Sequence, residues 1–188
     1  MKTRDLALGV VFSALTVALN FTVRIPAPFA TYLIYQIWEI PIVAAFFLFG
    51  TQIFLFVTGI NTIVLLILYP GATPLGPIYN MAAILSMMTG VGLIKILLDR
   101  HPLRNVAITT TLYTSFGIAA RTAVMSLVNY VILHYPPPVG LSPFPMTEAA
   151  ILVALPLIAV FNATLALYTI PIGYSVSKTV ARVIKTSG

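Results

Sequence analysis

The amino-acid sequence predicts an all-α membrane protein: six transmembrane helices form one domain over residues 1–188, with both ends of the chain in the cytoplasm. Hydrophobic residues make up 60% of the chain and charged residues 7%, whereas a soluble domain has about a quarter charged residues. The charged residues also leave long gaps. The gap between Glu39 and Lys95 exceeds two membrane crossings of about 20 residues each.

The first three apolar segments lie in the N-terminal part of the chain. The first follows Lys2 and Arg4, and no small-residue cleavage site closes it, so we expect a retained helix rather than a signal peptide. Residues 24–35 are rich in proline and aromatic residues and predict a loop. Gly50 separates the next two segments. The expected helices are 5–23, 37–49 and 51–68.

Three longer apolar segments follow. Residues 69–77 and 136–145 are dense in proline and glycine and predict loops, while 99–104 is a polar connector. Glu148 suits the positive N-terminal end of the last helix. The expected helices are 78–98, 105–135 and a last one from 147 to beyond 174, where Pro156 or Pro171 could introduce a kink.

The basic residues predict the orientation. With six crossings, the N-terminus, the 99–104 connector and the C-terminus fall on one side of the membrane. Most of the ten basic residues lie there, and basic residues concentrate in cytoplasmic loops. We therefore expect both termini in the cytoplasm and the three proline-rich loops outside. The basic residues in these regions are Lys2, Arg4, Lys95, Arg100, Arg104, Lys178, Arg182 and Lys185.

Two ionisable residues lie within predicted crossings, Glu39 and Arg121. Such residues are rare in membranes and usually face a cavity or a charged partner. Arg121 is roughly 24 Å from the cytoplasmic start of its helix, at 1.5 Å per residue. Both residues therefore belong to the outer part of the membrane. Two interpretations stay open: a structural ion pair between helices, or a solute pocket that one of them lines.

Amide side chains form a second group, because an amide offers donors and an acceptor to a polar ring edge. For Asn61 we favour a hydrogen bond between helices, which is common in membranes. Tyr35 and Trp38 stand at the end of a crossing and are expected to anchor the membrane interface. For Asn80, Asn129 and Asn162, which lie in or at the ends of other crossings, a structural and a ligand-binding use both stay open at this point.

Several kinds of chemistry have no candidate residues in this sequence. The chain has no cysteine, and neither His101 nor His134 has metal-ligand spacing around it. It has no glycine-rich phosphate loop, no paired carboxylates and no ATP-binding motif. The net charge of +6 is explained by cytoplasmic loops rather than by nucleic acid. Uphill transport would therefore need a partner or an ion gradient.

Five stretches together resemble one protein family. They are Ala14-x-x-x-Ala18, Tyr35–Pro41 with its acidic residue before a proline, Gly76–Asn80, Arg121–Tyr130 with its Arg-Thr…Met…Asn-Tyr run, and Pro156–Asn162. With the chain length and six crossings, they resemble the substrate-binding S-components of energy-coupling factor (ECF) vitamin transporters, and among these the riboflavin type. Small residues at four-residue spacing, as at Ala14 and Ala18, let another helix approach closely, either within the chain or from a partner.

The resemblance implies a function and its partners. An S-component captures a vitamin at the outer face of the cell membrane, works with a transmembrane coupling subunit and two cytoplasmic ATPase subunits, and is not an enzyme. It carries no cofactor, and the transported ligand here would be riboflavin or a related flavin. Ala14 and Ala18 would form the docking face for the coupling subunit. The implied ligand-binding residues are Glu39, Tyr79, Asn80, Arg121, Asn129 and Asn162.

One position departs from the riboflavin-type pattern. That pattern has a lysine three residues after the helix 6 asparagine, and this chain has Leu165. Another vitamin, such as pantothenate or a thiamine precursor, therefore stays open as the substrate. A different class also stays open: a stand-alone small-solute transporter, or an intramembrane enzyme or a scaffold for one. An enzyme should show clustered acids or histidines on its helices, and the sequence has none.

Overall fold

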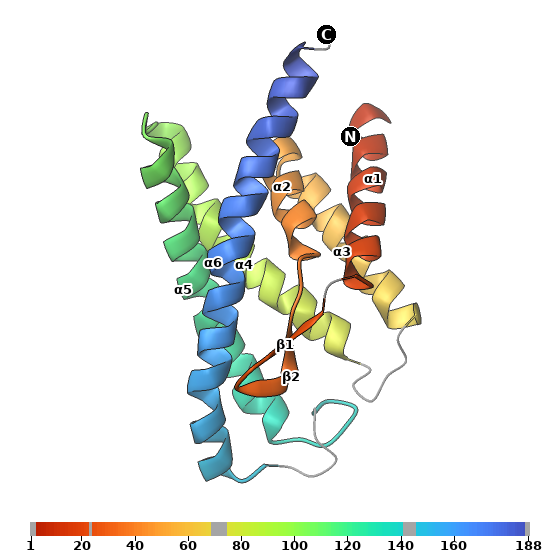
Figure 1. The fold of residues 1–188 in the computed structure, drawn as a ribbon, viewed down its shortest axis with the longest axis vertical. Helices are drawn as coiled ribbons and strands as arrows, with labels where there is room; N and C mark the ends of the chain where they lie inside the picture. Colours follow the sequence, from red (N-terminus) through yellow and green to blue (C-terminus); the bar gives the residue numbers. More distant parts are fainter. Residues whose placement is uncertain (1–2, 23, 69–74, 141–145, 187–188) are drawn as a thin grey trace.

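The computed structural model describes residues 3–22, 24–68, 75–140 and 146–186. Within these ranges the chain forms six helices and one short β-hairpin (Figure 1). Most of the predicted loop 69–77, the end of the loop 136–145 and the residue Lys2 lie outside the described residues. The elements are α1 (Thr3–Asn20), β1 (Ile25–Ala27), β2 (Ala30–Tyr35), α2 (Glu39–Phe49), α3 (Thr51–Leu68), α4 (Gly76–Arg100), α5 (Val106–Leu133) and α6 (Glu148–Thr186).

The helices have the composition of membrane spans. By length and hydropathy, α3, α4, α5 and α6 can each cross a bilayer, while α2 and the apolar part of α1 are shorter. The chain is a multi-pass membrane protein, as predicted. Its α2 has 11 residues, or about 16 Å of helix, against roughly 30 Å of hydrocarbon. The β1–β2 hairpin lies beyond the N-terminal end of α2 (Figure 1).

The connections between helices gather at two opposite ends of the molecule. The N-terminal end of α1, the C-terminal end of α6 and the connector between α4 and α5 lie at one end (Figure 1). The hairpin, the C-terminal end of α3 and the N-terminal ends of α4 and α6 lie at the other. This is the distribution that six crossings predict. We call the end that carries the hairpin the outer end, following the orientation expected from the basic residues.

Close helix packing holds the outer cavity described below in place. The helix α6 packs along α5 and α2, α4 packs along α5, and α1 packs along α3. Gly90 of α4 lies against the backbone of α5, where a Cβ atom would collide with the carbonyl oxygen of Phe116. Gly173 of α6 meets Val43 of α2 in the same way. Small residues permit such approach between helices in membranes.

The segment predicted as a loop, 24–35, is a two-stranded antiparallel hairpin. Ile25 pairs with Tyr35 and Pro26 with Ile34, and the register shifts before Ala27 pairs with Ala30. Proline is compatible with this because both strands of a two-stranded sheet are edges. The proline content therefore hid the strand signal of the aromatic and β-branched residues that follow it.

The last helix is longer than one membrane crossing. It spans 39 residues and continues through both internal prolines, Pro156 and Pro171. At 1.5 Å per residue this is about 58 Å, so the helix must extend beyond the hydrocarbon region. Glu148 is its first residue, at the positive end of the helix dipole as predicted.

Candidate ligand cavity

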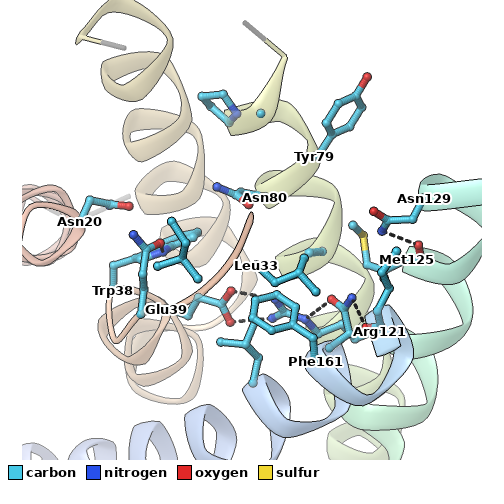
Figure 2. A pocket seen from close by; sticks show the side chains of 18 of the residues that line it. Asn20, Leu33, Trp38, Glu39, Tyr79, Asn80, Arg121, Met125, Asn129 and Phe161 are labelled. Carbon is cyan, nitrogen blue, oxygen red and sulfur yellow. Dashed lines mark hydrogen bonds and ion pairs between the residues drawn. The ribbon is translucent and has the colours of Figure 1, made fainter. Parts of the chain in front are cut away.

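A cavity of about 390 Å³ opens among the outer parts of the helices (Figure 2). This volume lies within the range of small-molecule sites, about 300–1,000 Å³. All six residues expected to bind a ligand line it, although they come from α2, α4, α5 and α6. Its lining consists of Asn20, Arg24, Leu33, Ile34, Gln36, Trp38, Glu39, Leu65, Gly76, Pro77, Tyr79, Asn80, Ala83, Arg121, Met125, Asn129, Ile132, Ile158, Phe161, Asn162 and Leu165.

The two ionisable residues of the crossings form an ion pair, as one interpretation of the sequence predicted. Arg121 Nη1 lies 2.6 Å from Glu39 Oε2, and Arg121 Nη2 lies 2.9 Å from Glu39 Oε1. Each residue has 3% of its surface exposed. This two-point geometry gives strong, directional hydrogen bonds. The pair joins α2 to α5 and also lines the cavity, so the two interpretations are compatible.

Asn162 of α6 completes this network. Arg121 Nε donates to Asn162 Oδ1 over 3.0 Å, and Asn162 Nδ2 donates to the carbonyl oxygen of Ile158 over 2.9 Å. The side chain is buried. The second N–H of its amide has no hydrogen-bond partner among the described residues. Arg121 also lies 3.6 Å from the sulfur of Met87 in α4, so four helices meet at this side chain.

Asn129 is the least committed amide of the cavity. It lies two turns beyond Arg121 on α5, and its Nδ2 donates to the carbonyl oxygen of Met125 over 2.7 Å (Figure 2). Among the described residues, Asn129 Oδ1 has no hydrogen-bond partner. The residue as a whole is buried, but Oδ1 is not among the buried polar atoms that lack a partner, so this atom is accessible from the cavity. Asn129 therefore offers an acceptor and a donor to a bound molecule.

The start of α4 contributes two further predicted residues at the edge of the cavity. Asn80 is exposed and has no hydrogen bond within the described part of the chain. The Tyr79 hydroxyl donates to the carbonyl oxygen of Val139, in the connection between α5 and α6. Figure 2 shows the Tyr79 hydroxyl pointing away from Arg121. This hydrogen bond links two outer segments, and contact between the Tyr79 ring and a ligand remains a prediction.

The sequence-based interpretation of Trp38 was wrong, and Tyr35 makes specific contacts within the protein. Trp38 is buried, lines the cavity and donates its indole N–H to Gln36 Oε1 over 2.7 Å. Tyr35 packs on α6, where its hydroxyl lies 2.8 Å from Thr164 Oγ1 and its ring 4.9 Å from that of Phe161. Trp38 is therefore part of the cavity wall and not an interface anchor. Tyr35 is half-buried, and its expected place at the membrane interface stays a prediction.

Asn20 is a cavity residue that the sequence analysis missed. Its Nδ2 donates to Asn61 Oδ1 over 2.8 Å, which confirms the hydrogen bond between helices predicted for Asn61. The backbone oxygen of Asn20 accepts from Arg24, which also lines the cavity. The available signal was the position of an amide in the last turn of the first helix, close to the predicted outer loop.

Part of the cavity wall is apolar. Leu165 is buried there, in a cluster with Ala27 and Phe161, and Leu33 packs against this cluster from the hairpin. The position that carries a lysine in the riboflavin-type pattern therefore belongs to a hydrophobic surface in this chain. A flat ligand could place an apolar face on this wall and its polar edge toward Asn129 and Asn162.

The two small residues proposed for partner docking lie on a separate surface. Ala14 and Ala18 are exposed on α1 and line a shallow apolar groove between α1 and α3, which includes Phe56 and Ile60. Their small size is therefore not used for packing within the described chain. Residues on other faces of α1, such as Thr16, are buried instead. The surface remains available to another helix.

Comparison with known proteins places the fold. No protein-family model matches the sequence, and no curated protein matches it. Among solved structures, the chain is similar to the S component of a bacterial ECF transporter, with a TM-score of 0.76 and 20% sequence identity. The match covers 98% of this chain and 99% of that one. The six-helix fold is therefore that of an S component over its whole length.

Proposed function

We propose that this chain is the substrate-binding subunit of an ECF-type importer in the cell membrane, and that it captures riboflavin or a related flavin at the outer face. One observation carries the proposal. Six residues chosen from the sequence, on four helices, line a single cavity of about 390 Å³ at the outer end. The likeness in fold to a bacterial S component supports the same assignment.

The cavity has the two surfaces that a fused aromatic ring requires. Phe161 and Leu165 offer an apolar wall, and burial of flat hydrophobic area favours binding. Asn129 and Asn162 offer donors and acceptors to the polar edge. Binding and translocation involve no covalent step in this proposal.

The partners follow from the proposed role. Ala14 and Ala18 would receive the transmembrane coupling subunit, because small exposed residues in an apolar groove let a second helix approach closely. Two cytoplasmic ATPase subunits, joined through the coupling subunit, would supply the energy. The lipid bilayer surrounds the helices, and nucleic acid has no part in the proposal.

The vitamin is the open element of the proposal. Leu165 supplies no charge to the cavity, whereas a riboflavin-type site would place a lysine there. The alternatives are another vitamin such as pantothenate or a thiamine precursor, a stand-alone small-solute transporter, and an intramembrane enzyme or its scaffold. The carboxylate that lines the cavity belongs to Glu39, and Arg121 neutralises it, an arrangement that favours binding over acid–base chemistry.

The decisive experiment purifies the protein in detergent and records its ultraviolet–visible spectrum. A bound flavin gives a yellow protein. The fluorescence of riboflavin should fall when it binds to protein that has been stripped of ligand. Parallel titrations with pantothenate and thiamine separate the vitamins. Co-purification with ATPase subunits separates a transporter component from a stand-alone protein. A colourless protein that binds none of the three vitamins would remove the proposed substrate class.

A further inference from the structure

Arg121 has little hydrogen-bonding capacity left for a ligand. A guanidinium has five N–H donors. Two of them reach the carboxylate of Glu39, one reaches Asn162 Oδ1, and one reaches the sulfur of Met87 at 3.6 Å. A ligand could receive at most the fifth. The positive charge is also neutralised by Glu39, so the pair offers little attraction to a charged substrate.

The same contacts fix the direction of one amide in the cavity. Arginine can only donate, so the atom of Asn162 that faces Arg121 Nε must be the oxygen. The backbone oxygen of Ile158 can only accept, so the nitrogen of Asn162 must face it. The two contacts agree, and together they exclude the flipped amide. The hydrogen left over on Asn162 Nδ2 is a donor.

We infer that Arg121 and Glu39 act as positioning residues, which hold the Asn162 amide so that it presents an N–H rather than a carbonyl oxygen to the ligand. This inference rests on the proposed ligand-binding function of the cavity. The ligand edge at Asn162 is then a hydrogen-bond acceptor. Asn129 keeps both an acceptor and a donor, because only one of its N–H groups is used. The two amides together suit a ring edge that alternates C=O and N–H groups.

The inference gives the buried ion pair a role in specificity. Without Arg121, the Asn162 oxygen loses its donor, and the bond from Nδ2 to the carbonyl oxygen of Ile158 is then the one restraint left on the amide. The flipped amide becomes less unfavourable, and in that orientation a ligand that presents a carbonyl oxygen would meet a second acceptor. The ion pair thus selects between ligands through Asn162 and without touching them.

The test is a double-mutant cycle on riboflavin affinity. The variant Glu39→Met/Arg121→Met removes the whole pair and leaves no unpaired charge. We expect it to bind riboflavin about two- to tenfold more weakly, the loss associated with one hydrogen bond. Adding Asn162→Ala to this variant should cost less than Asn162→Ala costs alone, because the two changes disrupt the same contact.

Asn129→Ala is the matched control, since Asn129 is a cavity amide that, among the described residues, makes no hydrogen bond with the pair. Its effect should be the same with and without the pair. Suppose instead that Asn162→Ala and Asn129→Ala each lower riboflavin affinity by the same factor with the pair as without it. That result would mean that Arg121 touches the ligand or shapes the whole cavity, and it would overturn the inference. Unchanged affinity in the pair-free variant would do the same.

A second variant keeps the test valid if the pair-free protein does not fold. Asn162→Asp retains an oxygen for Arg121 Nε and replaces the N–H that faces the cavity with an acceptor. We expect it to fold and to bind riboflavin at least as weakly as Asn162→Ala. If Asn162→Asp binds riboflavin as tightly as the unaltered protein does, the ligand does not accept a hydrogen bond from residue 162, and the inference is wrong.

A ligand-free measurement separates this inference from the proposed function. The side-chain amide signals of Asn162 and Asn129 are followed by nuclear magnetic resonance in protein labelled with ¹⁵N at asparagine. In the pair-free variant, or in Arg121→Lys, the Asn162 signals should shift while those of Asn129 hold. This result stands even if the protein binds no riboflavin. Asn162 signals that do not change would overturn the positioning role itself.

Discussion

Breaking the buried ion pair from one side should destabilise the protein more than removing both partners. Arg121→Met deletes the two hydrogen bonds of 2.6 and 2.9 Å to Glu39 and the 3.0 Å bond to Asn162. The Glu39 carboxylate then remains with 3% of its surface exposed. No other ion-pair partner of Glu39 exists among the described residues.

The size of the effect follows from this burial. Leaving a buried charge without its partner costs about 3–5 kcal/mol. Replacing both charges by apolar residues of similar volume is often neutral, or stabilising by about 1–4 kcal/mol. Glu39→Met/Arg121→Met should therefore be clearly more stable than Arg121→Met, although it carries one substitution more. Asn162 loses its donor in both variants, so that cost cancels in the comparison.

The assay measures thermal and denaturant-induced unfolding of the three proteins in the same detergent, followed by the fluorescence of Trp38. Trp38 is a suitable probe because it is the single tryptophan of the chain and lies buried beside Glu39 in the cavity wall. A free energy of unfolding for Arg121→Met that lies within about 1 kcal/mol of the value for the unaltered protein would refute the reasoning. So would a double variant that is less stable than the single one.

Three further predictions concern the ligand, the partner and the orientation. Asn129→Ala should weaken vitamin binding by roughly five- to 150-fold, because a polar contact left unpaired costs about 1–3 kcal/mol, and it should change stability little. Asn61→Ala, away from the cavity lining, should instead lower the melting temperature and leave affinity unchanged. Ala18→Trp should spare vitamin binding yet abolish co-purification with a coupling subunit, because the groove admits only small side chains; retained co-purification would contradict the docking face. In intact cells an impermeant thiol reagent should label Val139→Cys and leave Pro102→Cys unlabelled, and the opposite pattern would invert the orientation.

The sequence by itself determined the class of the protein and the set of residues to watch. Membrane helices need long apolar runs, so the six helices and their order could be read from hydropathy, and the predicted bounds of α3 are those observed. Polar residues inside such runs are rare. Glu39, Arg121, Asn129 and Asn162 therefore stood out, and all four line one cavity.

Spacing along a helix gives depth in the membrane, but the partner of each side chain depends on which helix faces which. Glu39 and Arg121 are 82 positions apart, and either could have faced an empty cavity. Trp38 was interpreted as an interface anchor because its position at the end of a crossing was visible in the sequence and its burial in the cavity wall was not. The proline content of residues 24–35 argued for a loop, so the hairpin that packs Tyr35 on α6 was not foreseen either.

Only the tertiary structure decided the directions of the polar groups. Asn162 is an amide in the sequence, with a donor end and an acceptor end that no pattern can orient. Its orientation is set by Arg121 from α5 and Ile158 from its own helix. Likewise, Ala14 and Ala18 suited internal packing or a docking face equally, until α1 was seen to pack on α3 with other residues. A hydrogen bond needs a donor and an acceptor brought within about 3 Å, and folding alone brings distant residues that close.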